Sequence, residues 1–128
     1  MSHTVLICDD ATFMRRVIER MLVAAGYTVV GEAATGPEAL RQYAALKPDL
    51  VTMDVVMPEM GGIDTARAIT AKDPDACIVM CSAMGQDALM AEALKAGAAA
   101  FVVKPFDQPQ LLAAAEQALA RRTARAAQ

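Results

Sequence analysis

Short apolar runs alternate with longer amphipathic segments five times along this chain of 128 residues. Short, continuously apolar runs of Val, Ile, Leu, Met and Cys indicate strands that are buried on both faces. The predicted strands are 4–8, 27–33, 50–54, 77–81 and 99–103. Each is followed by a segment whose apolar residues recur at helical spacing. This strict alternation leaves few folds open to the chain.

Alternating strands and helices with short connections predict a parallel sheet covered by helices on both faces. Right-handed crossovers favour a doubly wound (βα)5 α/β fold with five strands in the flavodoxin-like order 2-1-3-4-5. A closed eightfold barrel would need roughly twice this length. We therefore expect one domain over 1–128 with no output domain, and a basic tail, 121–128, that frays at the end of the last helix.

The helical segments carry their own start and stop signals. Thr35–Glu38 and Asp107–Gln110 have the form of capping boxes, which begin helices. Gly26 and Gly97 follow helical segments and are typical of helix ends. In the first helix the charged residues, Arg15 included, fall on the face opposite the apolar stripe.

Composition excludes several classes of protein. An apolar content of 55% is too high for a disordered chain, and a net charge of −3 argues against a general nucleic-acid or membrane-surface binder. No run approaches the ~18 apolar residues of a membrane span, and the start lacks the pattern of a signal peptide. We expect a cytoplasmic protein with no nucleic-acid ligand and no membrane insertion. The three cysteines lie in apolar runs, which indicates buried, reduced thiols.

Polar residues stand at the ends of four predicted strands. They are Asp9 and Asp10 after the first, Asp54 at the end of the third, Ser82 after the fourth and Lys104 after the fifth. In an open parallel sheet of this order, these strand ends converge on one crevice. Three neighbouring carboxylates repel one another unless their pKa values rise or a cation joins them. Oxygen ligands of this kind suit Mg²⁺, so the sequence predicts a magnesium site.

Phosphoryl transfer fits this set of charges. Asp54 could attack phosphorus and form an acyl phosphate, while Mg²⁺ and Lys104 neutralise the charge on the phosphoryl oxygens. Ser82 could donate a hydrogen bond to one of those oxygens. Taken singly, each residue is more often an ordinary turn or surface residue, so only their occurrence together predicts the site.

Over essentially its whole length, the chain resembles the receiver domains of two-component response regulators. The matching residues are Asp9-Asp10, Met53-Asp54, Met57-Pro58, Gly61-Gly62, Ser82-Ala83 and Lys104-Pro105-Phe106. It is most similar to the single-domain chemotaxis receivers, the CheY-like group. The segments that carry this closer likeness are 51–54, 58–60 and 81–86.

The resemblance implies that Asp54 accepts a phosphoryl group from a histidine kinase in a reaction that depends on Mg²⁺. It further implies that Asp10 ligates the metal directly, that Asp9 does so largely through water, and that the Val56 backbone carbonyl completes the protein ligands.

The resemblance also assigns the response to phosphorylation. Ser82 and Lys104 would hold the phosphoryl group, and a cis peptide is expected between Lys104 and Pro105. The hydroxyl of Ser82 would move to the phosphoryl group while Phe101, where the family often has Tyr, turns inward as a switch. Ordinary core or half-exposed packing is the alternative for Phe101.

The implied protein is a monomeric signalling phosphoacceptor rather than an enzyme, although it assists its own phosphorylation and dephosphorylation. Its expected partner is an output protein, first of all the flagellar motor switch. A single-domain phosphorelay carrier and a phosphorylation-independent pseudo-receiver scaffold are the alternatives.

Two other classes fit the residues less well. A magnesium-dependent phosphatase with an Asp nucleophile has its two acids separated by one residue after the first strand, whereas Asp9 and Asp10 are adjacent. A flavodoxin-like redox module needs a phosphate-binding loop at that place, and the acids of 9–13 would repel a phosphate.

Overall fold

The computed structural model describes residues 2–126, with side chains described as far as Arg121. Five strands and five helices alternate along this part of the chain. The strands are β1 (Thr4–Cys8), β2 (Thr28–Ala33), β3 (Leu50–Asp54), β4 (Ile78–Ser82) and β5 (Ala100–Val103). The helices are α1 (Thr12–Ala24), α2 (Gly36–Leu46), α3 (Gly62–Lys72), α4 (Asp87–Lys95) and α5 (Gln108–Ala126).

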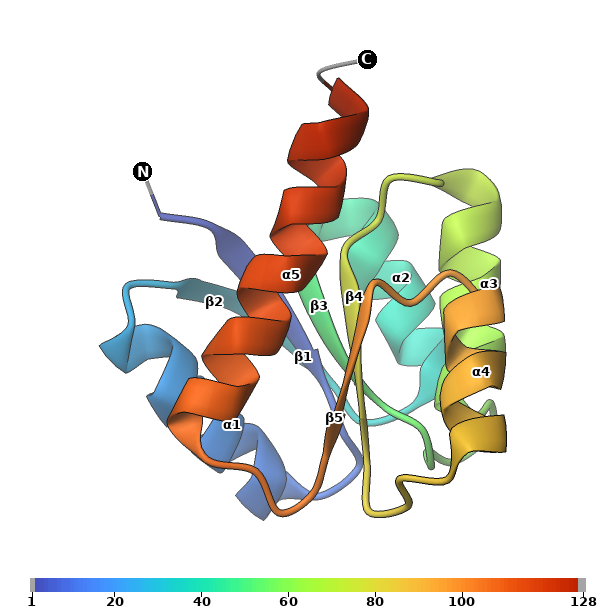
Figure 1. The fold of residues 1–128 in the computed structure, drawn as a ribbon, viewed down its shortest axis with the longest axis horizontal. Helices are drawn as coiled ribbons and strands as arrows, with labels where there is room; N and C mark the ends of the chain where they lie inside the picture. Colours follow the sequence, from blue (N-terminus) through green and yellow to red (C-terminus); the bar gives the residue numbers. More distant parts are fainter. Residues whose placement is uncertain (1, 127–128) are drawn as a thin grey trace.

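The strands form one parallel sheet in the order β2-β1-β3-β4-β5, which confirms the predicted fold. α1 and α5 cover one face, and α2, α3 and α4 cover the other (Figure 1). Because all strands are parallel, their carboxyl ends lie together along one edge, at the bottom of Figure 1. This edge is where ligands of such sheets bind.

The sheet separates two apolar clusters, because successive strand residues point to opposite faces. Val5 and Ile7 of β1 pack towards α1 and α5, whereas Leu6 and Cys8 pack towards α2, α3 and α4. β3 and β4 are buried along their whole length, which explains their continuously apolar sequences. Burial of a side chain such as Ile7 stabilises the fold by about 1.5–3 kcal/mol, so the central strands form a firm base for the residues at their ends.

The predicted helix signals are confirmed. The Thr35 hydroxyl accepts a hydrogen bond of 3.2 Å from the backbone N–H three residues later, at the start of α2. Asp107 and Gln110 each accept the other's backbone N–H at 2.9 Å, a complete capping box before α5. Gly26 and Gly97 have φ angles of 97° and 107°, a left-handed conformation that favours glycine after a helix.

The observed boundaries differ slightly from the predicted ones. β2 and β5 each begin one residue later than expected, and β4 is shifted by one residue, so that Ser82 is its last residue. α5 continues to Ala126, while 127–128 of the tail expected to fray lie outside the described residues. All three cysteines are buried, reduced thiols, as predicted. Among the helices described, none is long and apolar enough to cross a membrane.

Candidate functional site

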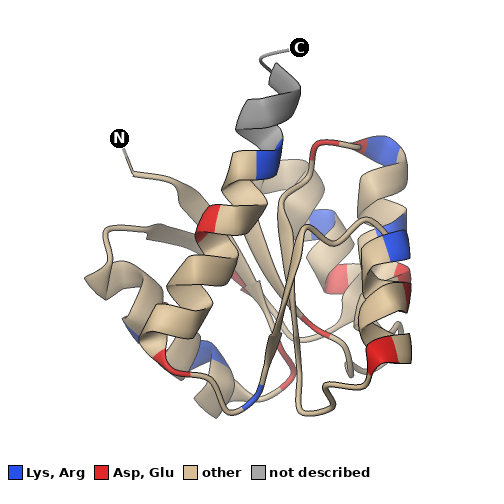
Figure 2. Ribbon diagram, in the orientation of Figure 1, with Lys and Arg blue, Asp and Glu red and all other residues tan. Residues whose placement is uncertain are grey.

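Acidic and basic residues lie near the ends of several strands at the carboxyl edge of the sheet (Figure 2), and the side chains of three of them contact one another. Asp9 follows β1, Asp54 ends β3 and Lys104 follows β5. The Lys104 Nζ donates to Asp9 Oδ2 at 2.8 Å and to Asp54 Oδ2 at 3.2 Å. Since β4 lies between β3 and β5, the lysine reaches across a strand to bridge the two carboxylates.

Asp9 is almost fully buried, with a side chain 1% exposed. Its Oδ1 accepts the backbone N–H of Ala11 at 2.9 Å, and its Oδ2 accepts the Lys104 ammonium. The Asp9 backbone N–H donates to the Ala33 carbonyl, which ties the end of β1 to β2. Both carboxylate oxygens of Asp9 are therefore already engaged by donors from the protein.

Asp54 is buried and has a raised pKa. Burial raises the pKa of its carboxyl group and the negative charge of Asp9 raises it further. Three interactions lower this pKa: the charge of Lys104, the hydrogen bond from the Val56 backbone N–H to Oδ1 at 3.2 Å, and the hydrogen bond from Lys104. The net shift of the pKa is still upward. Burial lowers the pKa of Lys104, but its bond to Asp9 and the two carboxylate charges outweigh that effect and leave this pKa raised. The lysine therefore stays charged, while the charge of Asp54 is only partly compensated.

Asp10 brings a third carboxylate to this edge. It is exposed, and one oxygen each of Asp9, Asp10 and Asp54 lie within 4.8 Å of one another. Hard divalent cations prefer such oxygen ligands. A cation would also reduce the repulsion among three carboxylates, of which Lys104 bonds to two. The residues present could therefore hold a metal ion.

The other predicted site residues lie around this cluster. Ser82 is buried at the end of β4, and its hydroxyl accepts the backbone N–H of Met84 at 3.0 Å. Val56 is exposed, two residues beyond Asp54. The peptide bond between Lys104 and Pro105 is cis. Phe101 is partly buried against the apolar cluster on the face covered by α2, α3 and α4.

The loop after β3 touches the backbone of Asp54. The Gly62 N–H donates to the Val55 carbonyl at 2.8 Å. A Cβ at Gly62 would lie 1.9 Å from the Asp54 carbonyl oxygen, whereas a Cβ at Gly61 would come no closer than 3.6 Å to its neighbours. In the same loop, Glu59 has a φ of 69°, which is uncommon outside glycine. The second glycine of the pair is therefore the one that lets this loop close on Asp54.

The position of Arg15 corrects the expectation from helical periodicity. Its side chain is only 14% exposed rather than directed to solvent. The guanidinium donates to the Asp9 carbonyl at 2.6 Å, to Glu32 Oε1 at 2.9 Å and to Thr12 Oγ1 at 3.2 Å. Arg15 lies seven residues before the buried Leu22, about two helical turns, so it sits at the edge of the apolar stripe and not opposite it. There it bonds to the Asp9 carbonyl and to Glu32 of β2.

An apolar groove of about 410 Å³ opens beside the charged cluster. Its lining residues are Phe13, Met14, Val17, Ala83, Lys104, Pro105 and Phe106. Phe13 is 76% exposed, a large apolar surface for a single side chain to leave in water. The carboxyl edge therefore combines a charged centre with an apolar border.

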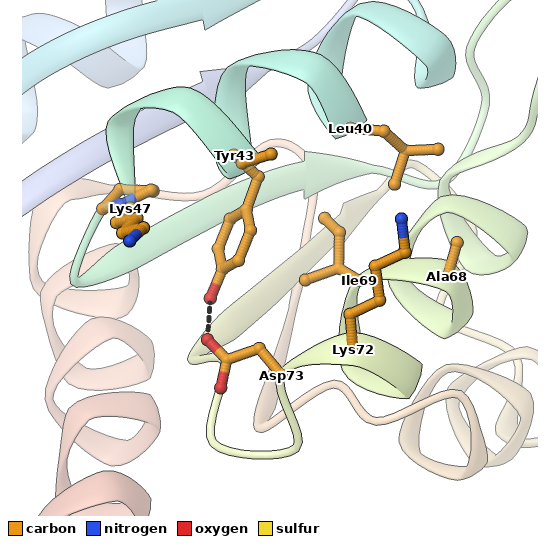
Figure 3. Close-up of a pocket in the computed structure, with 9 residues that line it drawn as sticks. Leu40, Tyr43, Lys47, Ala68, Ile69, Lys72 and Asp73 are labelled. Carbon is orange, nitrogen blue, oxygen red and sulfur yellow. Dashed lines mark hydrogen bonds between the residues drawn. The ribbon is translucent and has the colours of Figure 1, made fainter.

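A cavity of about 320 Å³ lies between α2 and α3 (Figure 3). It is lined by Leu40, Tyr43, Ala44, Lys47, Pro48, Ala68, Ile69, Lys72 and Asp73. Most of this lining is apolar, and the Tyr43 hydroxyl donates to Asp73 Oδ2 at 2.6 Å. Apart from Leu40 in the middle of α2, these residues belong to the carboxyl-terminal halves of the two helices and to the segments that follow them, at the opposite end of the sheet from Asp54. The cavity is therefore separate from the charged cluster.

Comparison with known proteins adds independent evidence. The family model described as the response regulator receiver domain matches residues 5–116. The chain is 53% identical over 114 residues to the chemotaxis protein CheY of Thermotoga maritima, covering 89% of this chain and 95% of that protein. It is 48% identical over 119 residues to CheY of Bacillus subtilis, covering 93% and 99%.

Solved structures give the same result. The crystal structure of the CheX–CheY–BeF3–Mg²⁺ complex from Borrelia burgdorferi matches with a TM-score of 0.85 and 34% identity, covering 88% of this chain and 85% of that one. The response regulator domain of Thermotoga maritima CheB matches with a TM-score of 0.86 and 34% identity, covering 94% and 98%. The family match over residues 5–116 includes the strands that carry the acids and the lysine.

Proposed function

Because the chain belongs to the receiver domain family of response regulators, we propose that Asp54 is the residue that accepts a phosphoryl group from a histidine kinase. The observation that carries this proposal is the position of Lys104, which bonds to both Asp9 and Asp54 at the carboxyl edge of the sheet. A lysine placed there neutralises charge on the phosphoryl group as it arrives at Asp54.

In the transfer step, a carboxylate oxygen of Asp54 attacks phosphorus. The P–N bond of a phosphohistidine breaks as the P–O bond of the acyl phosphate forms, and the imidazole leaves. The Val56 N–H holds one carboxylate oxygen and Lys104 contacts the other, so the carboxylate is oriented before the donor arrives.

The same residues account for a Mg²⁺ requirement. Asp10 and Asp54, with the backbone carbonyl of Val56, would hold the ion directly. Asp9 would act through water, because both of its carboxylate oxygens already accept hydrogen bonds from the protein. When bound, the ion supplies positive charge for the phosphoryl oxygens.

The apolar groove beside Lys104 fits the approach of the kinase. Phe13 and Phe106 border it, and burial of an exposed aromatic side chain stabilises protein–protein contact. A kinase that covers this groove would bring its phosphohistidine to the edge that holds Asp54. The groove thereby supplies affinity, while the charged cluster supplies the chemistry.

The output is a change of conformation that a protein partner recognises. The Ser82 hydroxyl leaves the Met84 N–H to bond a phosphoryl oxygen, and Phe101 turns into the space that this movement opens. The chemotaxis proteins among the relatives favour the flagellar motor switch as the partner. The Borrelia complex, in which a CheY is bound to CheX, supports recognition by a protein partner.

Intact-mass measurement with a small acyl-phosphate donor tests the assignment. The wild-type chain should gain one phosphoryl group in the presence of Mg²⁺ and none in the presence of a chelator, and Asp54→Asn should gain none. Absence of any gain in the wild type would reject the phosphoacceptor function. A gain that persists in Asp54→Asn would identify another nucleophile.

A further inference from the structure

Arg15 contacts the backbone of the acidic pair Asp9-Asp10. Its Nη1 donates to the backbone carbonyl of Asp9 at 2.6 Å, and its Nε donates to Glu32 Oε1 at 2.9 Å. The planar guanidinium makes these bonds from a fixed fork, so Glu32 on β2 determines where the group can sit. The end of β1 is thereby attached to α1 and β2 through one side chain.

The carbonyl that Arg15 holds belongs to the peptide between Asp9 and Asp10. Rotation of this peptide would turn the Asp10 carboxylate away from Asp9 and Asp54, whose oxygens now lie within 4.8 Å of its own. Asp9 is fixed by Lys104 and by the Ala11 N–H, but Asp10 is exposed. The bond from Arg15 to the Asp9 carbonyl is therefore a contact that restrains this peptide directly.

We propose that Arg15 is a positioning residue of the metal site, which fixes the Asp9–Asp10 peptide so that the Asp10 carboxylate faces Asp54. The inference rests on the proposed function, since it assumes that these acids bind Mg²⁺. Outer residues that orient metal ligands typically change metal affinity 10–100-fold when they are replaced. Because Arg15 holds backbone rather than a ligand side chain, we expect an effect at the lower end of that range.

Simple electrostatics predicts the opposite change in metal affinity when Arg15 is replaced, which makes the proposal testable. Arg15 is a positive charge close to a cation site, so its removal should strengthen cation binding if charge were its only contribution. Loss of positioning should weaken binding instead. The direction of the change in affinity therefore separates the two roles.

The experiment measures Mn²⁺ binding by loss of the free-ion electron paramagnetic resonance signal, with Mg²⁺ as competitor, on the full chain. Arg15→Met should weaken binding of both ions about tenfold. Arg15→Lys keeps the charge but lacks the fork, so it should weaken binding by a similar factor. Unchanged or tighter binding in Arg15→Met would overturn the proposal, as would full affinity in Arg15→Lys.

Arg16→Met is the matched control. Arg16 bonds to both oxygens of Glu32, at 2.8 and 2.9 Å, and to Glu19, but among the described residues not to Asp9. Its removal takes away the same charge from the same helix, and metal affinity should stay within about twofold of the wild type. Weakening equal to that of Arg15→Met would overturn the positioning role.

Two further measurements distinguish failure of the positioning role from misfolding and from failure of the proposed function. If Arg15→Met does not fold, Glu32→Gln removes the charged anchor of the guanidinium while leaving Arg15 in place. It should weaken binding about threefold, an estimate below the usual range because Arg15 itself remains; unchanged affinity would then overturn the proposal. Failure of the wild-type chain to bind either ion would reject the proposed metal site itself.

Discussion

The charged cluster at the carboxyl edge of the sheet and the cavity between α2 and α3 differ in how closely their residues contact one another. At the edge, Lys104 joins two buried carboxylates and Gly62 lies against the backbone of Asp54. In the cavity, apolar side chains leave about 320 Å³ open, and Lys72 at its border is exposed. A well-formed apolar cavity is the usual first indication of a binding site. A groove of about 410 Å³ also borders the carboxyl edge, so volume does not distinguish the two regions, whereas converging charges and close backbone contact mark the carboxyl edge.

Among the positions at the carboxyl edge, substitution of Gly62 should have the largest effect, because its backbone lies against that of Asp54. Gly62→Ala would place a Cβ 1.9 Å from the Asp54 carbonyl oxygen, so the backbone of the loop or of β3 must move. We expect the free energy of unfolding to fall by about 3 kcal/mol and phosphorylation of Asp54 to be lost. Urea denaturation and intact-mass measurement check the two effects.

Gly61→Ala is the matched control for that change. Its Cβ would meet the Val55 carbonyl at 3.6 Å, an ordinary contact, and the loss of stability should stay within about 1 kcal/mol, as for alanine at a helix N-cap. At the cavity, Ala68→Val should also be tolerated within about 1 kcal/mol, because the added methyl groups enter open space. Equal losses at all three positions would remove the contrast between the two regions.

Removal of one lysine from each region compares their charges. Lys104→Met leaves Asp9 and Asp54 without their shared donor, so we expect a loss of about 2–3 kcal/mol in unfolding free energy at neutral pH without metal. Lys72→Met removes an exposed charge at the cavity and should change stability by less than about 0.5 kcal/mol. Added Mg²⁺ should stabilise both variants, and Lys104→Met more strongly, because the ion compensates carboxylates that the lysine no longer neutralises. Similar losses of unfolding free energy in the two variants would show that Lys104 contributes no more to stability than an exposed lysine.

The contrast also separates what the sequence could predict from what it could not. Strand order follows from the alternation of elements and the handedness of crossovers, so the convergence of Asp9, Asp54 and Lys104 was predictable. The role of Gly62 was only partly visible, because the glycine pair does not show which member meets the Asp54 backbone. The contact of Arg15 was not predictable, since periodicity in one helix carries no information about a side chain on the neighbouring strand.

Another feature that a sequence cannot show is the state of a buried hydroxyl. Thr52 and Thr65 are both fully buried, but the Thr65 hydroxyl donates to the Gly61 carbonyl at 2.8 Å, in the segment between β3 and α3. The Thr52 hydroxyl, within β3, has no hydrogen-bond partner among the residues that the structure describes. One threonine therefore supports the tight edge, while the other carries an uncompensated polar group in the core.

Isosteric replacement by valine should change the free energy of unfolding in opposite directions at these two threonines. Thr52→Val should raise the free energy of unfolding by about 1 kcal/mol, because it removes a buried polar group that lacks a partner. Thr65→Val should lower it by about 1 kcal/mol, because the Gly61 carbonyl loses the hydroxyl donor and keeps only the backbone N–H of residue 65. Urea denaturation of the two variants provides the measurement. A loss of stability in Thr52→Val would show that its hydroxyl has a partner in solution.

The smallest expected effect concerns the charge of Asp54, because Lys104 and the Val56 N–H offset much of the penalty of burial. Since the pKa of Asp54 is raised on folding, the folded chain binds more protons than the unfolded chain in the pH range above the ordinary Asp value of about 3.9. Stability must then fall as pH rises through the folded pKa. In the presence of a chelator, the stability of Asp54→Asn relative to the wild type should therefore be least at acidic pH and should increase as pH rises through this range. Mg²⁺ should reverse the trend, because the ion stabilises the wild-type carboxylate. If Asp54→Asn is more stable than the wild type by an amount that depends on neither pH nor Mg²⁺, the charge of Asp54 is not the cause of the difference.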